Sequence, residues 1–326
     1  MKHITLSEYY EQEASNSNAH LLAPYIKAMA YSGISIRSVI ANASIDGIYG
    51  YTGTTNIHGE AVQHLDVIAD TCCIENLKEC GIVAGVVSEE QNEPIIFDSL
   101  HAPYVAVIDP LDGSSNIETN NTIGTIFCLF KRVTPVGEPI SSNDFLQRGT
   151  SCVCAGYIAY GPATMLVVTT GNGVDVFTYS SELNDFILIE KRREMPSQGP
   201  SYSINEAYLH TVDSSTQEYI KRIKEKSSHS LRYVGSLVAD THRILWKGGI
   251  FIYPTQYHNN TPKDKLRLLC ECIPIAFLIE QAGGEATNGS TRILSLLPQD
   301  IHERSALYYS SQKEMEDWKK CMQITS

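Results

Sequence analysis

The stretch Asp109-Pro110-Leu111-Asp112-Gly113-Ser114-Ser115-Asn116 decides the fold. It follows the apolar run Val105–Ile108, which is typical of a buried strand, and Pro110 ends that strand because proline has no N–H for a sheet ladder. Two acids around a Pro-Leu turn suit a hard cation such as Mg²⁺, and the Gly-Ser-Ser that follows can offer N–H and O–H groups to a phosphate. A plain capped turn uses the same residue types, so this motif alone leaves both interpretations open.

A second apolar run, Val86-Val87-Ser88-Glu89-Glu90, also ends in adjacent acids. Two strand ends of this kind can place four carboxylates around one pocket, where like charges repel unless a cation is present or some acids hold protons. Solvated loop acids would explain either motif alone, but the two together favour a metal site. Glu60 and Asp66 precede both motifs, and we expect them at the same site.

The composition is that of an ordinary globular protein, with 326 residues, 43% hydrophobic and 19% charged. The formal net charge of -12 argues against nonspecific nucleic-acid binding, which needs a basic surface. No apolar run approaches the ~20 residues of a membrane helix, and the N-terminus lacks an apolar signal-peptide core, so we expect no membrane partner. The nine cysteines lie mostly in apolar segments, which fits reduced thiols in a cytoplasmic protein.

Apolar periodicity predicts a mixture of helices and strands, as in an α/β protein. Leu21–Ile40 and Lys263–Gln281 have helical spacing, and we expect Gly33 to divide the first and Pro274 to kink the second. Strands are expected over Ile123–Phe130, Ala155–Tyr160, Met165–Thr170, Val174–Tyr179 and Phe186–Glu190, the last four as two hairpins.

The polar segment Lys191–Pro200 contains two prolines and a glycine. We expect the boundary between two halves of the chain here, with an N-terminal half at residues 1–195 and a C-terminal half at residues 196–326.

These motifs resemble those of class I fructose-1,6-bisphosphatases, most closely the bacterial members, from about Gly59 to the C-terminus and more weakly before it. The matching motifs are Leu65-Asp66-Val67, Val87-Ser88-Glu89-Glu90, Asp109 through Ile117, Gly124-Thr125-Ile126-Phe127, Tyr202 through Glu206, Arg232-Tyr233-Val234-Gly235-Ser236, and Lys265-Leu266-Arg267-Leu268-Leu269 with Glu271. The resemblance implies a layered α/β/α/β/α sugar-phosphatase fold with mixed sheets. It also implies hydrolysis of the 1-phosphate of fructose 1,6-bisphosphate, giving fructose 6-phosphate and phosphate, a step of gluconeogenesis.

The same resemblance assigns metal ligands and catalytic residues. It implies two or more Mg²⁺ ions per site, with Mn²⁺ or Zn²⁺ as alternatives. The matching ligands are Glu89, Asp109, Asp112, Glu271 and the carbonyl of Leu111. Asp66 and Glu90 match the acids that position or deprotonate the attacking water, and Glu60 stands near them where many members have Asp.

The resemblance also implies a pocket for the sugar bisphosphate. Gly113, Ser114 and Ser115 would hold the 1-phosphate, and Lys265 would lie between sugar and phosphate. The residues that match the 6-phosphate pocket are Asn205, Tyr208, Tyr233 and Tyr253. Arg232 matches an arginine that reaches this pocket from a neighbouring subunit, so at least a dimer is expected, and the family pattern is a homotetramer.

The AMP site of the family is altered in this sequence. A family Thr-Gly-Glu-Leu-Thr turn is replaced by Asn18-Ala19-His20-Leu21-Leu22, a family lysine by Pro103, and a family arginine by Lys131. These changes remove hydroxyl groups, a cation and a bidentate fork, all of which bind phosphate. We therefore expect weak or no inhibition by AMP.

Two other functions stay open at this stage. One is a sister phosphatase acting on sedoheptulose 1,7-bisphosphate or an inositol phosphate; Tyr202–Tyr208 and Arg232-Tyr233 favour a second phosphate pocket, which disfavours an inositol monophosphate. The other is a sugar-phosphate sensor without catalysis, which the complete set of matching acids disfavours.

Overall fold

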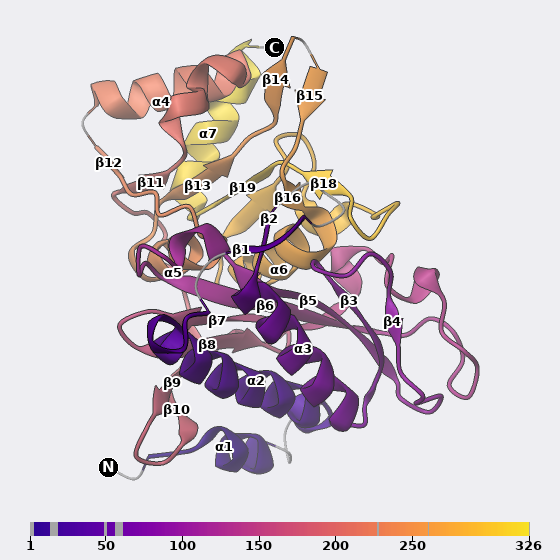
Figure 1. The fold of residues 1–326 in the computed structure, drawn as a ribbon. Helices are drawn as coiled ribbons and strands as arrows, with labels where there is room; N and C mark the ends of the chain where they lie inside the picture. Colours follow the sequence, from indigo (N-terminus) through magenta and orange to yellow (C-terminus); the bar gives the residue numbers. More distant parts are fainter. Residues whose placement is uncertain are drawn as a thin grey trace.

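The structure is a computed structural model that describes residues 3–13, 19–48, 51–55, 61–226, 228–259 and 261–325. It has five layers, in which helices and two sheets alternate (Figure 1). The expected α/β/α/β/α arrangement with mixed sheets is confirmed.

The larger sheet has eight strands in the order β10-β9-β8-β7-β6-β5-β3-β4. Only the β3–β5 pair is parallel, and this pair comes from the two apolar runs that end in acids. The expectation that Pro110 ends the second run is wrong, because β5 continues to Asp112 and accommodates the proline at an irregularity in its pairing with β6 between Asp109 and Asp112. The runs are buried on both faces, as parallel strands covered by helices usually are. The strands are β3 (Val83–Ser88), β4 (Ile95–Ile96), β5 (Tyr104–Asp112), β6 (Ile123–Lys131), β7 (Cys152–Tyr160), β8 (Thr164–Thr169), β9 (Val174–Ser180) and β10 (Asp185–Arg193).

Three N-terminal helices form the outer layer against this sheet: α1 (Leu6–Glu13), α2 (Ala19–Asp46) and α3 (His64–Glu79) (Figure 1). The expectation that Gly33 divides α2 is wrong, because the helix runs through it without a break. Gly33 instead allows close packing on β7, since a Cβ there would lie 2.5 Å from the Cδ1 of Ile158. A short pair of strands, β1 (Tyr51–Thr55) and β2 (Ala61–Gln63), leads into α3.

The smaller sheet has five strands in the order β12-β11-β13-β19-β17. Helices α5 (Leu237–Lys247) and α6 (Ile273–Gln281) pack between the two sheets, and α4 (Ser214–Glu225) and α7 (Gln312–Thr325) cover the outer face (Figure 1). The chain passes from the larger to the smaller sheet after β10, so we retain residue 195 as the proposed boundary. The strands are β11 (Ser201–Ser203), β12 (Ser230–Leu231), β13 (Ile250–Tyr253), β17 (Glu285–Thr287) and β19 (Leu307–Ser310).

The segment expected as one kinked helix, Lys263–Gln281, is built differently. It begins as β15 (Thr261–Lys263), which pairs with β14 (Gln256–His258), and continues as β16 (Leu266–Arg267), which pairs with β18 (Arg304–Ser305). A π-turn over Leu268–Cys272 then leads into α6. Pro274 lies in the first turn of α6, where a missing N–H is harmless, so the expected kink is absent.

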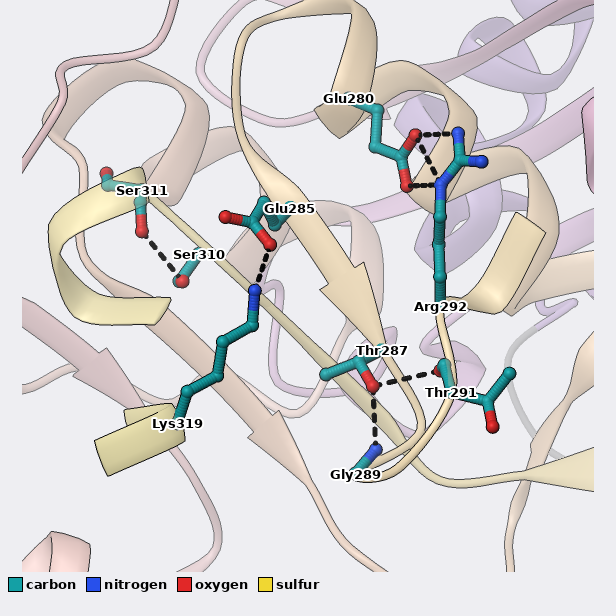
Figure 2. A network of polar contacts seen from close by, with 9 residues as sticks. All are labelled: Glu280, Glu285, Thr287, Gly289, Thr291, Arg292, Ser310, Ser311 and Lys319. Atoms are coloured by element: carbon teal, nitrogen blue, oxygen red, sulfur yellow. Dashed lines mark hydrogen bonds and ion pairs between the residues drawn. The ribbon is translucent and has the colours of Figure 1, made fainter. Parts of the chain in front are cut away.

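Polar contacts join the smaller sheet and the loop after β17 to helices α6 and α7 (Figure 2). The guanidinium of Arg292 donates to both carboxylate oxygens of Glu280 on α6, the closer of the Nε contacts being 2.9 Å. Lys319 on α7 forms an ion pair with Glu285 on β17. These side chains are partly exposed, so each pair contributes modestly to stability.

None of the nine cysteines forms a disulfide bond, and the seven that are buried pack within the fold. Within the described residues, no helix is both long and apolar enough to span a membrane.

Candidate active site

The two acidic strand ends meet in one cavity. Because β3 and β5 are parallel neighbours, Ser88 is in register with Ile108, and the chain leaves both strands at the same edge of the sheet. A cavity of about 410 Å³ opens there. Glu89, Glu90, Asp109 and Asp112 all line it.

A third element supplies another acid from the C-terminal half. The π-turn before α6 carries Glu271, whose Oε2 accepts a hydrogen bond from the backbone N–H of Arg267 at 2.6 Å. Oxygen atoms of Asp109, Asp112 and Glu271 lie within 4.8 Å of one another, and all three residues are buried. Among the described residues, this is the group of acids best placed to hold a metal ion.

The charge balance at these acids favours a bound cation. Burial raises the pKa of the Asp109 carboxyl well above its usual range, and the charges of Glu89 and Asp112 raise it further. Burial likewise raises the pKa of Glu271. The guanidinium of buried Arg267, which lies 3.6 Å from Glu89, offsets only part of this charge. The ligands are all oxygen atoms, which Mg²⁺ and Mn²⁺ prefer over the nitrogen and sulfur ligands typical of Zn²⁺.

Asp112 is oriented by the start of α5. Its carboxylate accepts hydrogen bonds from the Ser236 hydroxyl at 2.6 Å and from the backbone N–H groups of Leu237 and Val238 at 3.0 and 2.8 Å. The chain can approach α5 this closely because the next residue is Gly113: it has a φ of 77°, and a Cβ there would lie 2.6 Å from that of Ser236. This backbone requirement explains the glycine of the motif.

The residues after Gly113 form a short 3-10 helix, Ser114–Asn116, at the wall of the cavity. The first amide groups of such a helix have no partner inside it and can therefore bind an anion. Gln63 fixes the position of this helix, because its side-chain amide donates to the carbonyl of Ser114 at 2.9 Å. Ser115 is exposed at the cavity and Leu111 forms part of its buried wall.

Asp66 lies in the first turn of α3, directly behind Gln63. Its Oδ2 accepts a hydrogen bond from the backbone N–H of Gln63 at 3.0 Å, and the side chain of Ser114 also lowers its pKa by hydrogen bonding. Burial raises the pKa of Asp66 to about 6. The side chain is 4% exposed and does not itself line the cavity. Glu60, expected beside it, lies outside the described residues.

The residues expected around the second phosphate divide into two groups. Tyr233, Tyr253 and Lys265 line the same cavity as the acids. The others do not line it: Asn205 caps a short helix by accepting from the N–H of Ala207, Tyr208 is 44% exposed near Tyr233, and Arg232 is exposed and donates to the carbonyl of Leu231.

Sequence reasoning missed one acid of the cavity, Asp240. It lies in the first turn of α5, is 1% exposed, and accepts from the backbone N–H groups of Val234 and Gly235. Burial raises its pKa to about 6. It therefore holds the loop that carries Tyr233. Its only signal in the sequence was an acid four residues after Ser236, which is ordinary for a helix N-terminus.

Comparison with known proteins adds independent findings. Two family models match almost the whole chain: "Fructose-1-6-bisphosphatase, N-terminal domain" over residues 4–191 and "Fructose-1-6-bisphosphatase, C-terminal domain" over residues 195–323. The fold is also similar to the crystal structure of Leishmania major fructose-1,6-bisphosphatase in holo form. That match has a TM-score of 0.91 and 33% sequence identity, and it covers 98% of this chain and 99% of the other.

Proposed function

The chain belongs to the fructose-1,6-bisphosphatase family, and from this premise we propose that its acidic cavity hydrolyses the 1-phosphate of fructose 1,6-bisphosphate with metal-activated water. The products are fructose 6-phosphate and phosphate. The observation that carries the proposal is the convergence of Asp109, Asp112 and Glu271 within 4.8 Å in a cavity that Lys265 and two tyrosines also line.

Oxygen ligands of both chain halves would hold Mg²⁺. They are the carboxylates of Glu89, Asp109, Asp112 and Glu271 and the carbonyl of Leu111. When bound, such ions neutralise the phosphate, lower the pKa of water and stabilise the leaving oxygen. The buried, like-charged set supports this role, because without a cation it can be accommodated only by protonation. Mn²⁺ fits the same oxygen ligands, whereas Zn²⁺ fits them less well.

The remaining work of the chain is positioning and proton transfer, as in other phosphoryl transfers. The amide groups at Ser114 and Ser115 hold the 1-phosphate at the start of the short helix. Glu90 lines the cavity and accepts a proton from the attacking water, and Asp66, with a pKa of about 6, is mostly ionised at pH 7 and assists from behind Gln63. Glu60 keeps its expected role nearby.

Tyr233, Tyr253 and Lys265 bind the sugar and the 6-phosphate from the cavity wall. Asn205 and Tyr208 extend this pocket. We assign Arg232 to the pocket of a partner subunit, because it is exposed and does not line the cavity of its own chain. A homodimer or homotetramer would bring such a cation to the neighbouring 6-phosphate.

Two further points belong to the proposal. The changes at Asn18, Pro103 and Lys131 remove contacts for the AMP phosphate, so AMP inhibits weakly or not at all; Asn18 lies outside the described residues. The nine free cysteines support a cytoplasmic location.

The decisive experiment measures phosphate release from fructose 1,6-bisphosphate with Mg²⁺, then with EDTA, and with sedoheptulose 1,7-bisphosphate as the comparison substrate. Release that requires metal and favours the fructose compound supports the proposal. Preference for the sedoheptulose compound would move the chain to the sister activity, and no release from either would indicate a sensor.

A further inference from the structure

The acids Glu89 and Glu90 lie in a tight turn that begins where β3 ends. The backbone N–H of Gln91 donates to the carbonyl of Ser88 at 3.2 Å and closes the turn, while the N–H of Glu89 donates to Ile108 on β5 at 3.1 Å. Both acids line the cavity. Their direction therefore depends on what holds the two ends of this turn.

A buried acid on another element, Asp70, holds both ends. Its Oδ1 accepts from the hydroxyl of Ser88 at 2.6 Å, and its Oδ2 accepts from the side-chain amide of Gln91 at 2.5 Å. The Ser88 hydroxyl also accepts from the N–H of Glu90 at 3.3 Å. One carboxylate thus joins the first and last residues of the turn and, through Ser88, the acid between them.

The chemistry of Asp70 is specific to this arrangement. The residue is 3% exposed, and burying a carboxylate among neutral donors is costly, so an apolar residue would serve better if packing were its only role. Only a carboxylate can accept from both donors at once, because an amide of the same shape offers one acceptor and one donor group.

The position of Asp70 on α3 connects the turn to the rest of the site. Asp66 lies one helical turn earlier on the same helix, so a single rigid element sets the position of Asp66 and of the acids after β3. Groups that hold metal ligands in place often matter almost as much as the ligands themselves.

We propose that Asp70 is a positioning residue of the reaction, which directs Glu89 and Glu90 toward the metals and the attacking water through Ser88 and Gln91. This inference rests on the proposed function, since it assumes that these two acids act on metal and water. It predicts that Asp70 affects metal affinity more than it affects folding.

The test compares Asp70→Asn with Asp144→Asn. Asp144 is the matched control because it is also a buried carboxylate that holds a turn, accepting from the N–H groups of Val133, Thr134 and Ser141, yet it does not line the cavity. Three quantities are measured for each: the Mn²⁺ dissociation constant by calorimetry, the Mg²⁺ concentration for half-maximal activity, and the melting temperature.

For Asp70→Asn we expect metal affinity and Mg²⁺ activation to weaken by about 10-fold or more. For Asp144→Asn we expect a similar fall in melting temperature with metal affinity unchanged. Equal metal affinity in both variants would overturn the proposal and leave Asp70 with a structural role.

A second variant, Gln91→Ala, keeps the test decisive if Asp70→Asn folds poorly, because Gln91 is only partly buried. It should also weaken metal binding. The double variant should bind metal only a little more weakly than Asp70→Asn alone, because both substitutions remove the same contact. If the two losses of metal affinity add fully in the double variant, the result counts against the proposal. Wild-type chain that binds Mn²⁺ but releases no phosphate would refute the proposed function alone, whereas a wild-type chain that binds no metal would refute both.

Discussion

The hydroxyl of Ser236 donates a hydrogen bond to the carboxylate of Asp112 at 2.6 Å, which joins the end of β5 in the N-terminal half to the start of α5 in the C-terminal half. The same carboxylate accepts two backbone N–H groups of α5, where the helix dipole favours a negative charge. An acid that we propose as a metal ligand is therefore oriented by the other half of the chain. It follows that neither half contains a complete site.

Ser236→Ala should destabilise the fold and the site together. The hydroxyl is buried, donates to Asp112 and accepts from the N–H of Ala239 as the cap of α5. Loss of a helix cap costs about 1 kcal/mol, and loss of a hydrogen bond to a charged group about 1.5–3 kcal/mol, so we expect a total of about 2.5–4 kcal/mol by urea unfolding. A loss of only about 1 kcal/mol, the value for a helix cap alone, would show that the contact with Asp112 contributes nothing.

Asp109→Asn should stabilise the metal-free protein and abolish its response to metal. The substitution removes one negative charge from a buried set that also holds Glu271, while the amide oxygen can still accept from the N–H of Leu111. Wild type should gain about 2.7 kcal/mol of stability at a Mg²⁺ concentration of about 100 times the dissociation constant. Thermal melting with EDTA and with Mg²⁺ measures both effects. A variant that melts below wild type in EDTA would contradict the repulsion argument.

The dependence of kcat/KM on pH should report Asp66. Burial raises its pKa to about 6, and the proposed mechanism needs the ionised form, so activity should be lost as the pH falls through 6 and be retained above pH 7. The profile is measured from pH 5 to 9 at saturating Mg²⁺. Asp185→Asn, which removes an acid of raised pKa on β10, should leave the acid limb in place. A profile that stays flat down to pH 5 would mean that Asp66 is not the group that titrates.

The two strands that carry the site were predictable from sequence because their chemistry is local. β3 and β5 are short apolar runs rich in Val and Ile, and both end in acids. Parallel neighbours bring such ends to one edge of a sheet, so the meeting of Glu89 with Asp109 followed from strand pairing alone.

The errors arose where tertiary contacts decide local structure. The sequence suggests that Gly33 breaks the helix. In the structure a glycine is needed there because α2 packs closely on Ile158 of β7. Pro274 reads as a kink, yet the true start of α6 places it in the first turn. The residues near Gly33 do not reveal its contact with Ile158, and the residues near Pro274 do not reveal where α6 begins.

The rest of the site depends on long-range placement. Glu271 and Lys265 were connected to the acids only through the family resemblance, because no local pattern links them to β5. Asp70 and Asp240 carried no signal beyond that of an acid on a helix. Their roles became apparent only from the hydrogen bonds they accept.

AMP should inhibit weakly, with an inhibition constant above about 1 mM. Tyr104 and Lys131 lie opposite each other on β5 and β6, so Pro103 and Lys131 occupy one end of this strand pair. These two positions provide a single cation, the flexible Lys131, whereas the family pattern has a lysine and an arginine that can bind a phosphate through two N–H groups. Initial rates with increasing AMP at fixed Mg²⁺ measure the constant, and adenosine controls for effects of the base. Strong inhibition would show that other residues bind the AMP phosphate.

Arg232→Ala should raise the KM for fructose 1,6-bisphosphate by about 10-fold or more and leave Mg²⁺ activation unchanged, because a phosphate loses a charged hydrogen-bond donor. Mixing two impaired chains, assayed at a substrate concentration far below the wild-type KM, tests whether the arginine acts on a partner. The chain with Arg232→Ala keeps its metal ligands, and the chain with Asp109→Asn keeps its arginine. In hybrids formed by refolding the two together, the second chain can donate Arg232 to the intact cavity of the first. Random pairing in symmetric dimers should restore about one site in four. An arginine that acts on its own cavity would restore none, and the rates of the mixture would then equal the sum of the separate variants.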